Sequence, residues 1–123
     1  MKPEDLHPLL ASAVSSGDLA ACLALYEPSG ALAKQSGGVA LGAEEIGAEV
    51  GRFLALKGTL TVKTAKVVAT GEVALLRSLG AFSGVAPDGT HVEIPEHPAY
   101  EVARRQADGT WLFVVNDPWG VGA

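Results

Sequence analysis

The spacing of apolar residues changes once along the chain, near residue 59. Before this point apolar side chains recur every three or four residues, as they do on one face of an amphipathic helix. From Thr59 onward apolar and polar residues alternate, which is the pattern of a strand with one buried face. The pattern therefore predicts an α+β fold in which helices come first and a mainly antiparallel sheet follows.

The predicted helices cover residues 6–14, 19–26 and 42–57. Gly17 and Asp18 separate the first two, because glycine suits the left-handed residue that ends a helix and aspartate suits the N-cap of the next. Pro28 and its neighbours end the second helix, and a brief strand is expected over residues 31–34. The first two helices should therefore form a hairpin.

The predicted strands of the second half cover residues 59–71, 73–85, 90–94, 99–106 and 110–116. Pro95 and Pro98 interrupt the pattern, so we expect a kink, bulge or short excursion between the third and fourth of these strands. Asp108-Gly109 is a strong hairpin signal before the last strand. The strands should therefore follow one another as antiparallel neighbours.

The composition is that of one globular domain, residues 1–123, with 48% hydrophobic and 19% charged residues. The net charge is −5 and the nine Lys and Arg residues are scattered, so nucleic acid is not an expected partner. No apolar run is long enough to cross a membrane, and we expect a cytoplasmic protein. Cys22 is the only cysteine, which excludes an internal disulfide, and its helical context indicates a small buried side chain.

The order of these elements and turns resembles the nuclear transport factor 2-like superfamily, and within it the SnoaL-like and ketosteroid-isomerase-like group. The segments that carry the resemblance are residues 17–18, 25–28, 42–46, 104–111 and 116–120. The resemblance implies a cone-shaped, cystatin-like α+β domain, with three N-terminal helices in the concave face of a curved sheet and a pocket between them. It also implies a small organic ligand and a homodimer formed through the convex sheet face.

Members of that superfamily include isomerases, polyketide cyclases, dehydratases, epoxide hydrolases and non-catalytic binders, so the fold alone does not define a function. In the ketosteroid isomerases a tyrosine binds the oxyanion, and its position corresponds to one near Leu10 in this chain. The aspartate base of those enzymes corresponds to a position at or near Lys34. Leucine offers no polar group, and a charged ammonium cannot remove a proton. Steroid isomerisation is therefore not expected.

Glu101 is the candidate catalytic residue, because the resemblance places it where the isomerases hold a protonated acid. Among apolar walls a glutamate can serve as a neutral donor or a general acid. The alternative is a solvated glutamate, or one paired with Arg104 or Arg105. A two-residue turn at Asp108-Gly109 would place Glu101 opposite Asn116, on a shared face.

A three-residue turn would instead place Glu101 opposite Val115, and the sequence leaves both registers open. The candidate ligand-binding residues are Tyr26, Phe53, His97, Trp111, Asn116, Asp117 and Trp119. The aromatic members could wall a pocket or simply fill the core. His97 could exchange protons near neutral pH, and Asp117 could be an acid at the pocket mouth or a turn residue.

His91, Glu93, Glu96 and His97 include metal-ligand types, but the prolines among them disrupt the geometry and we expect no metal. The sequence has no phosphate-binding glycine loop and no nucleophile elbow, and no cofactor is expected.

Two hypotheses follow. The first is a binder of a small, mostly apolar organic molecule that also performs cofactor-free acid-base chemistry through Glu101. The second is a non-catalytic, dimeric ligand-binding or assembly domain. A cavity of several hundred cubic ångströms beside Glu101 would favour the first, and a filled interior would favour the second.

Overall fold

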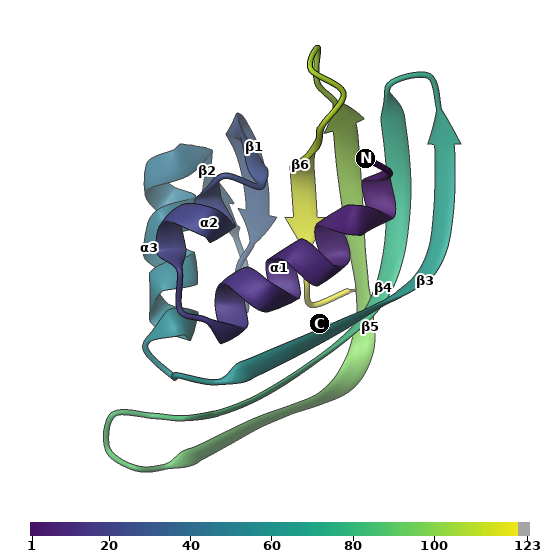
Figure 1. Cartoon of the computed structure of the whole chain (residues 1–123). Coiled ribbons are helices and arrows are strands. Elements are labelled where there is room, and N and C mark those ends of the chain that lie inside the picture. Colours follow the sequence, from purple (N-terminus) through teal and green to yellow (C-terminus); the bar gives the residue numbers. More distant parts are fainter. Residues whose placement is uncertain (121–123) are drawn as a thin grey trace.

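The helices lie in the first half of the chain and the long strands in the second, as the sequence predicts (Figure 1). The computed structural model describes residues 1–120. A short 3-10 helix (Pro3–Asp5) leads directly into α1 (Leu6–Ser15), which is followed by α2 (Leu19–Leu23) and later by α3 (Gly42–Leu54). The fold class predicted from the sequence is confirmed.

The junction between α1 and α2 forms as predicted. Gly17 is left-handed, with φ of 71°, and its N–H donates to the Val14 carbonyl while the Asp18 N–H donates to the Ala13 carbonyl. These two bonds satisfy carbonyl groups at the helix end. The Asp18 carboxylate then accepts from the Ala21 N–H at 3.0 Å and caps α2.

The six strands form one sheet in the order β2-β1-β6-β5-β4-β3. Their bounds are β1 (Tyr26–Ala33), β2 (Val39–Leu41), β3 (Thr59–Thr70), β4 (Val73–Val85), β5 (His91–Arg105) and β6 (Trp111–Asp117). Neighbours are antiparallel except β1 and β6, which are parallel. The long strands β3, β4 and β5 bend, and α1 lies across the concave side that they create (Figure 1).

The second helix and the first strand differ from the prediction. Helix α2 ends at Leu23 and β1 begins at Tyr26, so residues predicted to be helical or a turn belong to the sheet. The pairing of β1 with β6 is irregular between Tyr26 and Ala31, and Pro28 lies within this irregular stretch. A proline can occupy such a position because no ladder hydrogen bond is required there.

The proline-containing segment is one continuous strand, β5, with a bulge rather than a break. Ile94 pairs with Phe82 and His97 pairs with Gly80, so Pro95 and Glu96 lie opposite the single residue Ala81. The predicted interruption between residues 94 and 99 is therefore a β-bulge, one of the three forms that the sequence allows.

The last hairpin combines both predicted registers. Gln106 and Thr110 close a three-residue loop in which Gly109 is left-handed, with φ of 86°. A second bulge between Val102 and Ala103 then shifts the pairing by one residue, and Glu101 lies opposite Asn116. The loop length is that of the three-residue alternative, and the partner of Glu101 is that of the two-residue alternative.

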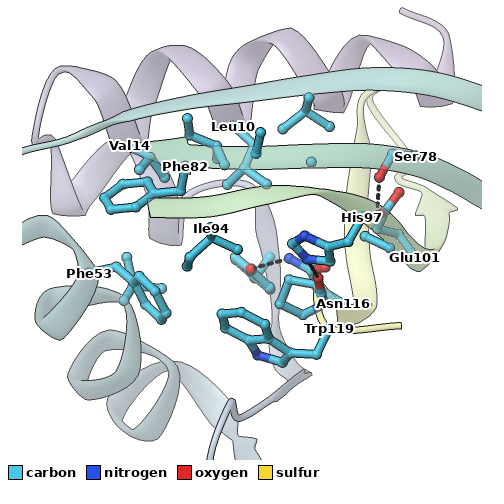
Figure 2. A pocket seen from close by; sticks show the side chains of 18 residues that line it. Leu10, Val14, Phe53, Ser78, Phe82, Ile94, His97, Glu101, Asn116 and Trp119 are labelled. Atoms are coloured by element: carbon cyan, nitrogen blue, oxygen red, sulfur yellow. Dashed lines mark hydrogen bonds between the residues drawn. The ribbon is translucent and has the colours of Figure 1, made fainter. Parts of the chain in front are cut away.

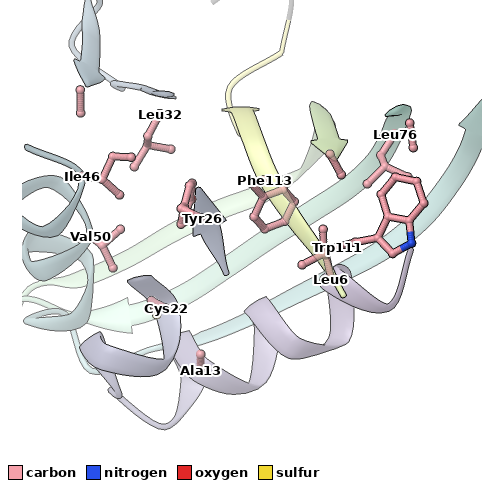
Figure 3. Packing of buried hydrophobic residues seen from close by; sticks show 13 residues of the cluster. Leu6, Ala13, Cys22, Tyr26, Leu32, Ile46, Val50, Leu76, Trp111 and Phe113 are labelled. Carbon is pink, nitrogen blue, oxygen red and sulfur yellow. The ribbon is translucent and has the colours of Figure 1, made fainter. Parts of the chain in front are cut away.

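The main core lies between the helices and the concave side of the sheet. Leu6 of α1 packs near Trp111 and Phe113 of β6, while Ile46 and Val50 of α3 face Tyr26 and Leu32 of β1 (Figure 3). Cys22 is fully buried in this cluster. Within residues 1–120 we find no helix that is long and apolar enough to span a bilayer.

Candidate functional site

A cavity of about 130 Å³ lies between the helices and the bent strands β3, β4 and β5. It is smaller than the several hundred cubic ångströms that would accommodate a drug-sized ligand. Its apolar walls come mainly from Leu10, Val14, Val50, Phe53, Leu60, Val62, Phe82, Ile94 and Ala99. The polar side chains that reach it are Tyr26, Ser78, His97, Glu101 and Asn116.

Aromatic rings occupy one end of the cavity. Phe53 of α3 packs edge-on against Phe82, with 6.1 Å between ring centroids, and at a tilt of 31° against Trp119, with 5.6 Å between centroids. Trp119 also stacks on His97, with centroids 5.9 Å apart and planes within 4°. Figure 2 shows Phe53 and Phe82 at the opposite end of the cavity from Ser78 and Glu101, with Trp119 and His97 between them.

His97 fastens the segment after β6 to the bulged part of β5. Its Nε2 lies 2.6 Å from the Pro118 carbonyl oxygen and its Nδ1 lies 2.9 Å from the Pro95 carbonyl oxygen. The ring therefore contacts a backbone carbonyl oxygen of each segment, one through each nitrogen. His97 therefore positions Trp119 beside the cavity.

Glu101 is the acid at the inner end of the cavity, with 4% of its surface exposed. Its place follows from strand alternation, since Ala99, Glu101 and Ala103 of β5 are all buried on the concave side. Ser78 of the neighbouring strand β4 donates to Oε2 at 2.8 Å. The other oxygen, Oε1, lies 2.5 Å from Nε2 of His7.

His7 lies behind Glu101, on the side away from the cavity, and has no exposed surface. Its second nitrogen, Nδ1, lies 2.6 Å from the hydroxyl of Thr64 on the edge strand β3. An imidazole can donate from one nitrogen and accept at the other. His7 therefore gives Glu101 a buried hydrogen-bond partner that can either donate to the carboxyl group or accept from it.

Tyr26 and Asn116 form a second polar pair in the cavity wall. The Asn116 amide donates to the Tyr26 hydroxyl oxygen at 2.8 Å. The hydrogen bonds within residues 1–120 give this hydroxyl no acceptor for its own hydrogen, which can therefore serve a ligand. Burial raises the pKa of the Tyr26 phenol, and the nearby Cys22 and Glu101 raise it further against the lowering effect of the Asn116 bond.

Most of the residues proposed from the sequence meet at this cavity. Glu101, Tyr26, Phe53, His97, Asn116 and Trp119 all line it. Trp111 and Asp117 do not. Trp111 packs in the main core beside Leu6, and Asp117 pairs with Tyr100 on the convex side and accepts from the Trp119 N–H at 3.3 Å.

Sequence reasoning missed His7, Ser78 and Thr64. A signal for His7 existed, because it precedes Leu10 by three residues and so shares its helix face. Ser78 is the polar member of the buried alternating positions of β4. The pairing of Thr64 with His7 depends on how α1 crosses β3, which no local pattern records.

The polar residues around Pro95 are dispersed. His91 pairs with Glu93 at 3.0 Å on the surface, Glu96 pairs with Lys63 at 3.3 Å, and His97 alone reaches the cavity. Within residues 1–120 no three histidine, cysteine or acidic side chains form a group suited to a metal ion.

No family model and no curated protein matches the chain. Several solved structures do. A candidate calcium/calmodulin-dependent protein kinase II association domain from Xanthomonas campestris is 21% identical, with a TM-score of 0.80 over 93% of this chain and 81% of that one. A ketosteroid isomerase-like protein from Erwinia carotovora atroseptica is 19% identical, with a TM-score of 0.78 over 93% and 89%.

An NTF2-like protein with a cystatin-like fold from Novosphingobium aromaticivorans is 22% identical, with a TM-score of 0.74 over 91% of this chain and 75% of that one. The chain has the nuclear transport factor 2-like fold. The resemblance seen in the sequence is thus confirmed at the level of fold. Other structures of this fold are candidate dehydratases and ring hydroxylases, so the site must supply the argument for function.

Proposed function

We propose that this NTF2-like domain binds a small, mostly apolar organic molecule in the cavity and performs cofactor-free acid-base chemistry on it through Glu101. The observation that carries the proposal is the placement of Glu101. It is a buried carboxyl at the wall of an apolar cavity, held by Ser78 and hydrogen-bonded to His7. A carboxyl and an imidazole joined in this way can give or take a proton without a cofactor.

The size of the cavity limits the ligand. An engineered apolar cavity of roughly 150 Å³ in another protein takes up benzene, so a cavity of about 130 Å³ suits a single ring. The Tyr26 hydroxyl offers a hydrogen bond to an oxygen of that ligand. A one-ring compound with a carbonyl group fits both the apolar walls and this donor.

Binding can be tested with benzene and cyclohexanone, followed through the methyl NMR signals of Leu10, Val14 and Ile94. Both probes should shift these signals. Gly80 offers a way to close the cavity, because a Cβ added there meets nothing nearer than the Thr61 carbonyl oxygen at 3.9 Å. Gly80→Leu should weaken binding of both probes at least about tenfold, and Ser83→Leu, an outward position on the same strand, should not.

The Tyr26→Phe variant separates the polar contact from the apolar one. Loss of one hydrogen bond to the ligand should weaken cyclohexanone binding about fivefold, while benzene binding stays unchanged. Equal binding of both probes by wild type and Gly80→Leu would show that the cavity is not the binding site.

The acid-base part has its own measurement, the protein-dependent exchange of the α-hydrogens of cyclohexanone in D2O. In this exchange a C–H bond breaks, Glu101 takes the proton, and a deuteron returns to the carbon. Glu101→Gln should slow the exchange about 100-fold or more, whereas Glu93→Gln, an exposed glutamate on the same strand, should not. Unchanged exchange in Glu101→Gln would leave a binder without catalysis.

A second candidate function, an assembly domain, is favoured by an apolar row on the convex side of the sheet. Strand register aligns one residue from each strand on this side: Val68, Leu75, Val102, Val115, Ala31 and Leu41. Val68, Leu75, Val115 and Leu41 are each at least 40% exposed. We propose a second copy of this chain as the partner of this row.

A further inference from the structure

The hydrogen bonds of Glu101 continue past His7 to the surface of the molecule. His7 Nε2 lies 2.5 Å from Glu101 Oε1, and His7 Nδ1 lies 2.6 Å from Thr64 Oγ1. Both distances are short for hydrogen bonds between nitrogen and oxygen. The three side chains come from β5, α1 and β3, so the path crosses from the inner wall of the cavity to the edge of the sheet.

Each group on this path can both give and accept a hydrogen. A hydroxyl donates and accepts, a neutral imidazole donates at one nitrogen and accepts at the other, and a carboxyl accepts when ionised and donates when protonated. Two orientations of the path are therefore possible. In one, Thr64 donates to His7 and His7 donates to Glu101. In the other every donor is reversed. Moving from the first to the second, water gives a proton to Thr64 Oγ1, the Thr64 hydrogen passes to His7 Nδ1, and the His7 Nε2 hydrogen passes to Glu101.

The two ends of the path lie in different surroundings. Thr64 is exposed on β3, which has only β4 as a sheet neighbour, and it lies at a bulge of that strand. Glu101 is 4% exposed and contacts the cavity. The other partner of Glu101, Ser78, is 1% exposed, so it does not extend the path to solvent.

We propose that Thr64, His7 and Glu101 form a proton relay between solvent at the edge of β3 and the cavity. The relay rests on the proposed role of Glu101 in acid-base chemistry. A ligand that fills an apolar cavity of about 130 Å³ displaces the water through which Glu101 could regain or lose a proton. The relay supplies a route that the ligand does not block.

The test follows exchange of the His7 ring hydrogen with water by NMR on protein labelled with ¹⁵N-histidine. It uses the Gly80→Leu background, in which the added side chain fills the cavity and closes the other route. Thr64→Val keeps the shape of threonine but removes its hydroxyl, and should slow the exchange about tenfold or more. Thr64→Ser retains the hydroxyl, and its His7 ring hydrogen should exchange as fast as in the parent.

Thr70→Val is the matched control, since Thr70 is an exposed threonine at the C-terminal end of β3. Exchange of the His7 ring hydrogen should stay unchanged in this variant. A structural role for Thr64 would alter thermal stability without singling out this one ring hydrogen. Exchange in Thr64→Val as fast as in the parent would overturn the relay. If Thr64→Val does not fold, Thr64→Ala serves in its place, with the same expected slowing.

The relay and the proposed function fail in different ways. Exchange of His7 is measured without any ligand, so the relay can stand even if cyclohexanone neither binds nor exchanges its α-hydrogens. The converse result is also possible: cyclohexanone exchange depends on Glu101, while Thr64→Val leaves exchange of the His7 ring hydrogen unchanged. That result supports the chemistry and rejects the relay.

Discussion

At the scale of single residues, the interior is shaped by the His7–Glu101 pair. Both side chains are almost fully removed from water, and together with Ser78 they satisfy each other's hydrogen-bonding groups. Removing one partner of a buried pair leaves the other without compensation, while removing both is far less harmful.

We therefore predict that His7→Leu lowers the free energy of unfolding by about 3 kcal/mol. The double variant His7→Leu/Glu101→Leu should be more stable than His7→Leu alone, because no unpaired carboxyl remains. Urea unfolding of the two single variants and the double variant measures this coupling. Strictly additive effects would mean that the two side chains do not stabilise each other.

Tyr26 should make the protein sensitive to alkali. Because burial raises the pKa of its phenol above the ordinary value of 10.0, the folded state holds this proton more tightly than the unfolded state. The stability is therefore fully present below about pH 10 and is lost as the pH rises further. The melting temperature should fall steeply above about pH 10, and less steeply in Tyr26→Phe.

Absorbance of phenolate at 295 nm provides the check, since the chain has two tyrosines. Tyr26 should ionise together with unfolding, and comparison with Tyr26→Phe identifies its share of the absorbance. Reversible ionisation of Tyr26 before unfolding would contradict the prediction.

The sequence predicted the residues of the site better than their partners. Glu101 stands out because the family resemblance implies an acid at its position, and Asn116 because one of the two predicted hairpin registers places it opposite Glu101. His7 and Thr64 are 57 residues apart, and their contact depends on the path of α1 over β3. Local patterns record which face a side chain takes, but not which distant side chain it meets.

At the scale of elements, Gly58 controls how β3 starts after α3. A Cβ at this position would lie 2.4 Å from the Ser83 carbonyl oxygen and equally close to the Phe82 ring. Since Phe82 also lines the cavity, the close packing of these strands sets the shape of the site.

Gly58→Ala should accordingly lower the free energy of unfolding by about 1–3 kcal/mol, because backbone atoms must move to admit the methyl group. Gly51→Ala is the matched control. Gly51 lies inside α3 with open space around its Cβ position, so alanine should stabilise the helix by about 0.5–1 kcal/mol. Thermal and urea unfolding measure both changes, and a neutral Gly58→Ala would refute the steric argument.

The limits of sequence-based prediction at this scale appear at β1 and at the last hairpin. Residues 26–30 read as a helix end and a turn, and only 31–34 as a strand, yet pairing with β6 and β2 makes 26–33 one strand, because tertiary pairing outweighs local propensity. In the hairpin, the loop residues indicate the turn length, whereas the unpaired Val114 of β6 shifts the register so that Asn116 joins Glu101 on the inward face.

At the scale of the whole molecule, the apolar row on the convex side is the surface most in need of a partner. A net charge of −5 disfavours self-association, but the row itself carries no charge. The adjacent row on the same side places Lys66 and Arg77 toward one edge and Asp117 toward the other. A two-fold axis parallel to the strands would bring Arg77 near Asp117 of the partner subunit. Two copies would then be complementary both in apolar surface and in charge.

The prediction is a homodimer that Leu75→Glu disrupts. A glutamate at this position of the row would lie against apolar side chains across the interface, at the cost of burying an unpaired charge. Light scattering coupled to size exclusion should report a dimer for wild type and a monomer for Leu75→Glu. Leu9→Glu, which adds the same charge at an exposed leucine of α1, should remain dimeric. A monomeric wild type at all concentrations would exclude the assembly function, and it would leave the binding and proton-transfer chemistry of the cavity untouched.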